Sequence, residues 1–311
     1  MAKEKAIIRT DISKSKWTLI QMKKNWAGYA MIFPFFLLFF IFTVVPVLMS
    51  VVLSFTTFNL LEWPNFIFMD NYIRLLLDDD IFLIAIKNTL VFAAITGPGS
   101  YLLCLFFAWF INELRPKIRA FVTVLFYAPS ISGMVYLIWT IFFHSDQYGF
   151  VNAWLIKLNI ISKPILWFQD EKYIFTLIVV VALWTSLGAS FLTFIAGFQV
   201  VNQELYEAGA MDGVKNRWQE LWFITLPTMR PQMMLGAILA ITGSFGFGAH
   251  ITALVGFPSP NYVAHTIMHH LDDYGGMRFE MGYASAIATI LFFMMIGANL
   301  IVTRVLRKVG S

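Results

Sequence analysis

The chain of 311 residues is 59% hydrophobic, and only 13% of its residues are charged. A soluble domain carries roughly a quarter charged residues, so this composition excludes an ordinary soluble protein and indicates an integral membrane protein. The single cysteine, Cys104, excludes a disulfide framework and a thiolate metal site. The formal net charge of +4 does not indicate a nucleic-acid partner, because the basic residues follow a membrane topology.

Residues 1–26 form a basic segment, which we expect to be cytoplasmic and separate from a transmembrane domain of residues 27–311. Apolar residues such as Ile12, Trp17 and Ile20 alternate with lysines there. This pattern fits an amphipathic helix on the inner leaflet, and it equally fits a disordered tail. The segment is too polar for a cleavable signal peptide, and the first apolar run has the full length of a span.

Six apolar stretches are long enough to cross a membrane as helices, for which about 20 predominantly apolar residues suffice. Gly97-Pro98-Gly99 lies within the second stretch, and we expect a kink there that neighbouring helices can tolerate. The sequence therefore predicts an all-α polytopic membrane protein with six transmembrane helices. Their expected ranges are 27–55, 82–111, 120–143, 173–198, 233–256 and 283–303.

The basic residues predict the orientation of these spans. With the N-terminus in the cytoplasm, 16 of the 22 Lys and Arg residues fall in inside segments and six fall in outside segments. Cytoplasmic segments of membrane proteins carry an excess of Lys and Arg. This distribution therefore predicts that both termini are cytoplasmic, and it places residues 204–231 on the cytoplasmic side.

The predicted membrane interior is almost without charge. In the stretches 121–143, 173–198 and 233–257, the readily ionisable side chain apart from tyrosine is His250. Ion- and proton-coupled carriers generally place Asp, Glu, Arg or His within their spans, so the composition argues against secondary transport and against most intramembrane enzymes. His269 and His270 have no companion ligand at a suggestive spacing, which argues against a metal site. The chain also has no GxxxxGK[ST] segment to hold a nucleotide.

Uncharged polar residues gather near the middle of three predicted spans. Hydroxyl groups beside aromatic faces suit a neutral ligand rich in hydroxyls, whereas small polar residues also allow helices to pack closely. Both explanations remain open from the residues alone. The candidate substrate-path residues are Ser130, Ser132, Trp184, Thr185, Ser186, Thr242 and Ser244.

Residues 204–231 form the one sizeable polar stretch in the second half of the chain. Small residues in it let another chain approach closely, and flanking charges can fix the register of that contact. From charge content alone, an ordinary solvated loop explains the stretch equally well. The candidate contact residues are Glu207, Ala208, Gly209, Asp212, Gly213, Leu226 and Pro227.

The order of these residues resembles the EAA loop of ABC importer permeases, which reads roughly EAA-x3-G-x9-I-x-LP. Here Glu207-Ala208-Gly209 is followed by Gly213 and then by Ile224-Thr225-Leu226-Pro227. The longer match, EAGAMDG followed by RWQELWFITLP, is similar to the sugar-type subfamily of maltose and oligosaccharide permeases. Three further segments stand where such permeases carry similar residues: Asn88-Thr89-Leu90, Phe126-Tyr127-Ala128-Pro129 and Gly282-Tyr283-Ala284-Ser285-Ala286.

Two departures from the family's pattern fall inside this loop. The third motif position is Gly209 where the family has alanine, and because glycine costs roughly 1 kcal/mol against alanine in a helix, we expect a looser first helix. Ten residues separate Gly213 from Ile224 where the family has nine. We expect the extra residue to rotate the second segment of the loop relative to the first.

The resemblance implies a mechanism and a set of partners. Such loops fold as two short helices, and the first lies in a cleft of a cytoplasmic ATPase subunit. Glu207 and Asp212 would anchor the loop through salt bridges or helix caps, and Pro227 would end the segment. Two ATPase subunits, a second permease of different sequence and an extracellular solute-binding protein are implied, in the cytoplasmic membrane of a prokaryote. ATP and Mg would be bound by the ATPase subunits, and this chain would bind no cofactor.

The sequence thus predicts a permease subunit of an ABC importer, not itself an enzyme, with a sugar or oligosaccharide as cargo. An importer of amino acids or polyamines is the first alternative, although strongly charged cargo would need compensating charge in the spans. A membrane-embedded lipid or polyprenyl glycan transferase would need an acidic, histidine or metal cluster facing a cavity. A channel or secondary carrier is disfavoured by the uncharged interior.

Overall fold

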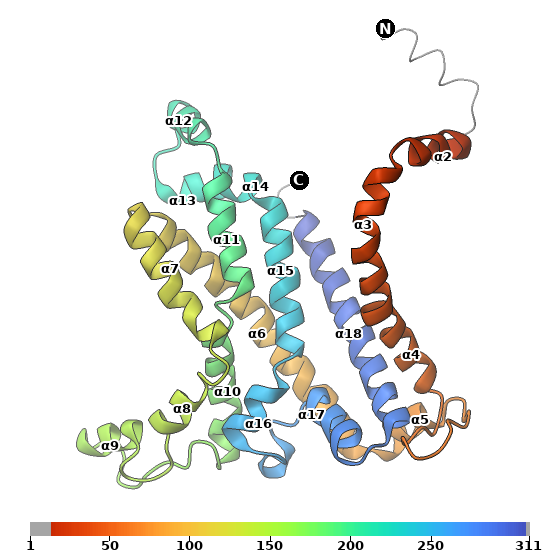
Figure 1. Ribbon diagram of the computed structural model, residues 1–311. Coiled ribbons are helices and arrows are strands. Elements are labelled where there is room, and N and C mark those ends of the chain that lie inside the picture. Colours follow the sequence, from red (N-terminus) through yellow and green to blue (C-terminus); the bar gives the residue numbers. More distant parts are fainter. Residues whose placement is uncertain (1–13, 309–311) are drawn as a thin grey trace.

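The computed structural model of the protein describes residues 14–308, and helices dominate this part of the chain (Figure 1). The bridge between Thr56 and Phe66 is an isolated antiparallel pairing outside any strand. The all-α prediction is therefore confirmed for the described residues. Of the predicted basic segment, residues 1–13 lie outside the described part, and the remainder begins with a helix, α2 (Lys14–Lys24). Its contact with the inner leaflet stays a prediction.

Three predicted spans are continuous helical paths that are long and apolar enough to cross a membrane. The first joins two α-helices through a π turn, and the other two are single helices. α6 continues without a break through Gly97-Pro98-Gly99, so the expected disturbance there does not interrupt the helix. The bounds are α3 Trp26–Phe39, η1 Phe40–Val44, α4 Val45–Leu53, α6 Asp80–Asn112 and α18 Met281–Lys308.

The other three predicted spans are not single helices, which corrects the sequence prediction. The fourth and fifth are helix pairs bent by 42° and 43°, and the third divides into two helices with Ser132 extended between them. Each break contains serine or glycine, which are poor helix formers. The total of six spans stays a prediction. The bounds are α7 Pro116–Ile131, α8 Leu137–Phe142, α10 Glu171–Thr185, α11 Ala189–Val200, α15 Arg230–Phe245 and α16 Gly248–Val255.

Short helices connect the spans at the two ends of the bundle (Figure 1). At one end, four of them link α11 to α15, with bounds α12 Gln203–Met211, α13 Arg217–Glu220, η3 Leu221–Thr225 and α14 Leu226–Thr228. At the other end lie α5 Asp70–Ile73, η2 Arg74–Asp78, α9 Phe150–Lys157, η4 Pro260–Tyr262, α17 Ile267–Asp272 and η5 Asp273–Met277.

α6, α11 and α15 form the packed centre of the bundle. Phe191 and Phe194 of α11 are fully buried there. Gly236 lets α15 approach closely, because a Cβ at this position would lie 2.7 Å from the ring of Phe194. Small residues at helix contacts permit such packing in a membrane, where the hydrophobic effect does not drive helices together. At the edge, α4 packs on α18, whereas α3 diverges from the bundle (Figure 1).

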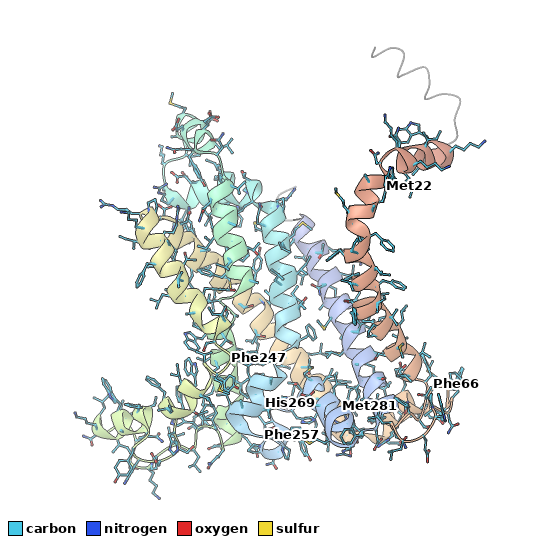
Figure 2. The ribbon with its side chains drawn as sticks, viewed as in Figure 1. Met22, Phe66, Phe247, Phe257, His269 and Met281 are labelled. Atoms are coloured by element: carbon cyan, nitrogen blue, oxygen red, sulfur yellow. The ribbon has the colours of Figure 1, made fainter. Side chains whose placement is uncertain are left out.

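The first and last described helices end on one side of the bundle. α2, with Met22 on it, lies at the same end as α12 and the C-terminal end of α18 (Figures 1 and 2). Phe257 and His269 lie at the opposite end (Figure 2). This placement agrees with the predicted location of both termini on one side of the membrane, and their assignment to the cytoplasm stays a prediction.

Candidate functional site: an exposed loop and a polar cavity

The loop of residues 202–228 is shaped by caps and by one glycine. The side chain of Asn202 accepts a hydrogen bond from the amide of Glu204 at 3.1 Å and begins α12, and Asn216 accepts one from Gln219 at 2.9 Å and begins α13. Between the two helices, Gly213 has φ +94°, a left-handed conformation that glycine adopts at little cost. The predicted pair of short helices is thus present, and the capping residues are asparagines, which the sequence reasoning did not single out.

α12 stands out from the end of the bundle and presents an exposed face (Figure 1). Ala208 is exposed on it, and Met211 at its end is 89% exposed. The carboxylates of Glu207 and Asp212 are exposed as well, and neither forms an ion pair with another described residue. Small, apolar and acidic groups are therefore available together on a helix that its own chain does not cover.

Gly209 lies against the protein's own chain at Ile224, and its place on the contact surface stays a prediction. A Cβ here would lie 2.5 Å from Cδ1 of Ile224, so glycine permits a close approach between α12 and η3. The hydroxyl groups of Tyr206 and Thr225 form a hydrogen bond of 2.8 Å across the same contact. α12 is unbroken over Gly209, and the expected loosening of this helix stays a prediction.

The extra residue between Gly213 and Ile224 coincides with a π turn. In η3 the amide of Leu226 donates to the carbonyl of Leu221, five residues earlier. A π turn contains one more residue per hydrogen-bonded ring than an α turn, so an additional residue fits here without ending the helix. Leu226 and Pro227 follow directly in α14, where proline occupies the first turn and leaves no amide unsatisfied.

A cavity of about 530 Å³ lies inside the bundle, bordered by all three helix breaks. Irregular backbone at membrane depth is tolerated where it lines such a cavity. Five of the predicted path residues line it: Ser130, Ser132, Thr185, Ser186 and Ser244.

Trp184 and Thr242 are not among the residues that line this cavity, so the cavity does not support their predicted place on the substrate path. The ring of Trp184 lies 5.4 Å from that of Trp139, edge to face. Thr242 is exposed on a face of α15 other than the one that carries Gly243 and Ser244 to the cavity. Residues adjacent in a helix point about 100° apart, so neighbours of a lining residue often do not line the cavity themselves.

The cavity also includes residues that the sequence reasoning missed. Thr96 and Ser100 come from α6 and Ser190 comes from α11. The spacing of Thr96 and Ser100, four residues apart in an apolar helix, is a signal for one polar face. His250 lines the cavity too, and its Nδ1 is buried without a hydrogen-bond partner among the described residues.

Most hydroxyl groups around the cavity donate their proton to a backbone carbonyl of their own helix. Thr96 donates to the carbonyl of Phe92 at 2.8 Å, Ser130 to that of Tyr127 at 2.8 Å, and Ser186 to that of Leu183 at 2.7 Å. Ser100 and Ser244 follow the same pattern. A hydroxyl that donates in this way keeps its lone pairs, so the cavity presents hydrogen-bond acceptors.

Aromatic rings line the side of the cavity formed with α16. Phe247 stacks on His250 with ring centroids 4.4 Å apart, and Phe92 lies 5.5 Å from Phe247. The ring of Tyr136 meets His250 edge to face at 5.5 Å, and Figure 2 shows Phe247 near the centre of the view. The described residues that line the cavity include no Asp, Glu, Lys or Arg. Acceptor oxygens and ring faces without fixed charge suit a neutral ligand that donates hydrogen bonds.

A buried polar network lies at the opposite end of the bundle from α12. His270 forms a hydrogen bond of 2.9 Å with Asp79 and one of 3.2 Å with His265, and Tyr283 donates to Asp79 at 2.8 Å. His265 belongs to this network through its bond to His270, and the sequence reasoning did not single it out. Burial opposes ionisation of Asp79, but hydrogen bonds from His270, the amide of Phe82 and Tyr283 outweigh it and hold the pKa of Asp79 below its usual range.

Comparison with known proteins shows which family this chain matches and which proteins are similar to it. Residues 100–311 match the family model described as "Binding-protein-dependent transport system inner membrane component". The chain is 32% identical over 295 residues to the probable ABC transporter permease protein YesP of Bacillus subtilis (strain 168), covering 93% of this chain and 92% of YesP. It is 28% identical to the arabinooligosaccharides transport system permease protein AraP of the same organism, covering 93% and 91%.

The fold is also similar to a solved structure. A chain of a bacterial alginate ABC transporter, crystallised in complex with an alginate pentasaccharide-bound periplasmic protein, matches with a TM-score of 0.76 at 22% identity. The match covers 94% of this chain and 97% of that chain. At this identity the likeness concerns the fold alone.

Proposed function

Because the chain belongs to the family of binding-protein-dependent transport system inner membrane components, and is thus a permease subunit of an ABC importer, we propose that its cargo is a neutral oligosaccharide. The observation that carries the proposal is the cavity at the three helix breaks, with its acceptor oxygens and aromatic side. Sugar rings stack their apolar faces on aromatic rings, and their hydroxyls donate to acceptors. The relatives named for oligosaccharide transport support the same cargo class.

The energy source in this proposal is a pair of separate cytoplasmic ATPase subunits that bind ATP and Mg. The exposed face of α12, with Ala208 and Met211 uncovered by the chain itself, supports a docking role. Glu207 and Asp212 are free for partner cations, and Gly213 sets the turn that keeps α12 outside the bundle. When the paired ATPases close on ATP, they draw the docked loops together and turn the cavity from one side of the membrane to the other.

The remaining partners follow from the same arrangement. One chain supplies one loop and one side of a path, so a second permease subunit of different sequence completes the pore. An extracellular solute-binding protein delivers the sugar at the end of the bundle that carries α9 and α17. The solved transporter with a periplasmic protein supports this kind of partner. The complex resides in the cytoplasmic membrane of a prokaryote.

Cargo of other classes fits the cavity less well. An amino acid or a polyamine carries full charges, and the described residues that line the cavity supply no opposite charge. Charged groups without a partner are costly at membrane depth. A lipid or glycan transferase would need acid–base groups or a metal in the cavity, and His250 is the one readily ionisable side chain other than tyrosine among the described lining residues.

The cargo proposal is tested with the complex purified together with its native partners and reconstituted in liposomes. ATP hydrolysis is measured with the binding protein and, in turn, arabino-oligosaccharides, malto-oligosaccharides, alginate oligosaccharides, an amino-acid mixture and spermidine. We expect stimulation by a neutral oligosaccharide. Stimulation confined to amino acids or spermidine would contradict carbohydrate as the cargo, and stimulation confined to alginate would contradict neutral cargo.

A further inference from the structure

The loop that carries α12 meets α6 through a small contact made by α13. The ring of Trp218 lies 4.8 Å from that of Trp109 and 6.4 Å from that of Phe106. Beside it, Nη2 of Arg217 lies 3.3 Å from a carboxylate oxygen of Glu113 at the end of α6. Trp109 is buried in the bundle, so its ring gives Trp218 a fixed surface.

The space around this contact is hollow. A polar cavity of about 540 Å³ separates the loop from the ends of α6, α7 and α11, and Asn112, Arg119, Gln199 and Gln203 line it. A packed core would distribute a displacement over many contacts. Beside this hollow the loop contacts α6 at Trp218 and Arg217, and Leu221 of η3 is buried in the same cluster as Trp109. The Trp218 contact is thus one of few routes by which motion of the loop reaches α6.

α12 and α13 are connected to each other firmly enough to move together. The hydrogen bond between Tyr206 and Thr225 joins α12 to η3, and Ile224 packs against Gly209. η3 continues directly from α13, because Leu221 follows Glu220 without a break. A displacement of α12 is therefore passed to α13, and with it to Trp218.

α6 connects this contact to the cavity and to the far end of the bundle. A helix of 33 residues is about 50 Å long. Its middle carries Thr96 and Ser100, which line the central cavity. At its far end, Asn88 donates to the carbonyls of Tyr262 and His265, both at 3.0 Å, and Thr89 accepts from the amide of Ile267 at 2.9 Å.

We infer that Trp218, with Arg217 beside it, is a positioning residue that transmits displacement of α12 to α6, and through α6 to the central cavity. The inference rests on the proposed docking of the ATPase on α12. Trp218 acts through Trp109 and not through the docked subunit.

The matched control is Trp222, four residues further along the same loop. The two indoles are almost equally exposed, 60% for Trp218 and 63% for Trp222. Trp222 has no ring contact with another described residue, whereas Trp218 has two. Trp218→Ala and Trp222→Ala thus both remove a large aromatic side chain from the loop. Of the two, Trp218→Ala also removes the ring contacts with α6.

The experiment follows the cavity directly, so that it does not depend on the cargo. In the full complex, Cys104→Ser removes the native thiol of this chain and Ser132→Cys places a thiol in the cavity lining, so labelling is followed on this subunit after separation from its partners. The rate of labelling of this thiol by a water-soluble maleimide is measured with and without ADP–vanadate. Co-purification of the ATPase subunits and the rate of ATP hydrolysis are measured on the same samples.

We expect Trp218→Ala to keep its ATPase subunits and to hydrolyse ATP, while the nucleotide-induced change in labelling rate falls about fivefold. Trp218→Phe, which keeps a ring against Trp109, should restore most of the change, and Trp222→Ala should retain it. An unchanged response in Trp218→Ala, or an equal loss in Trp222→Ala, would overturn the inference. Loss of the ATPase subunits from Trp218→Ala would overturn it too, because Trp218 would then be a docking contact. If the parent complex holds no ATPase, the proposed function itself fails, and the inference with it.

Discussion

At the scale of single residues, the direction of each hydroxyl decides what it contributes. Thr185 and Thr242 look equivalent in the sequence, since each lies near the middle of a predicted span and within two residues of a serine. Thr185 lines the cavity, and its hydroxyl donates to the carbonyl of Val181 at 2.9 Å, which leaves its lone pairs for a ligand. Thr242 is exposed on another face of α15. The two residues therefore form a matched pair.

Replacing Thr185 by valine keeps the shape of the side chain and removes the acceptor oxygen. A lost hydrogen bond contributes about 0.5–1.5 kcal/mol, so we expect sugar uptake at subsaturating concentration to fall about three- to tenfold. Uptake is measured in liposomes alongside co-purification of the ATPase subunits, which should not change. Thr242→Val should transport sugar like the parent. Equal uptake in both variants would show that Thr185 packs between helices and that its hydroxyl does not bind the sugar.

At the scale of elements, the exposed loop is held in shape by backbone geometry. The chain turns at Gly213 with φ +94°, and no atom lies within 4 Å of the position that a Cβ would take there. A side chain at Gly213 therefore meets no steric clash, and its cost is the left-handed backbone, about 1–2 kcal/mol. The π turn of η3 similarly accommodates a residue that an α-helix would not.

We expect Gly213→Val to leave the chain folded in the membrane and to displace α12, so that the fraction of ATPase co-purifying falls about tenfold. Gly297→Ala is the control, because Gly297 lies in α18 with free space around it and a φ outside the left-handed range. The amount of each variant in the membrane fraction is measured together with the bound ATPase. Full retention of the ATPase by Gly213→Val would show that the turn does not position α12.

At the scale of the whole molecule, the buried network around Asp79 joins the start of α6 to α17 and α18, with partners 191 and 204 residues later in the sequence. Burial lowers the pKa of His265 to about 3, with the neighbouring His269 and His270 adding to the shift, and burial lowers the pKa of His269 to about 4. Both imidazoles are thus neutral in the folded protein at pH values where they would be charged in an unfolded chain. This difference makes the stability of the molecule depend on pH.

The free energy of unfolding falls as the pH falls, because the unfolded chain binds more protons than the folded chain. Below about pH 6.5 the unfolded chain binds protons at these histidines and the folded chain does not, so the free energy of unfolding falls by about 1.4 kcal/mol per pH unit for each histidine. The lowered pKa of Asp79 acts in the same direction at more acidic pH. We expect the melting temperature in detergent to fall from pH 7 to pH 5. His265→Gln should reduce this fall, and identical pH profiles for the parent and His265→Gln would contradict the prediction.

The sequence by itself determined three properties of the protein. It is an all-α membrane protein, its long polar loop lies at residues 204–231 of the chain, and it resembles one family. These properties depend on local composition and on the order of residues in one segment, and a single chain carries both without reference to its packing. Glu207, Gly213 and Leu226-Pro227 could be recognised because their spacing is read along the chain.

Only the tertiary structure decided which hydroxyls share a cavity, that Gly209 faces Ile224, and that Trp218 meets Trp109. The physical reason is that a few small polar residues in a hydrophobic span do not by themselves fix its rotation, so packing against distant helices sets which residue points inward. The helix breaks at Ser132, Ser186 and Gly246 were hidden for the same reason: an apolar run has the composition of a continuous span, and a cavity that satisfies the interrupted backbone exists once the neighbouring helices are in place.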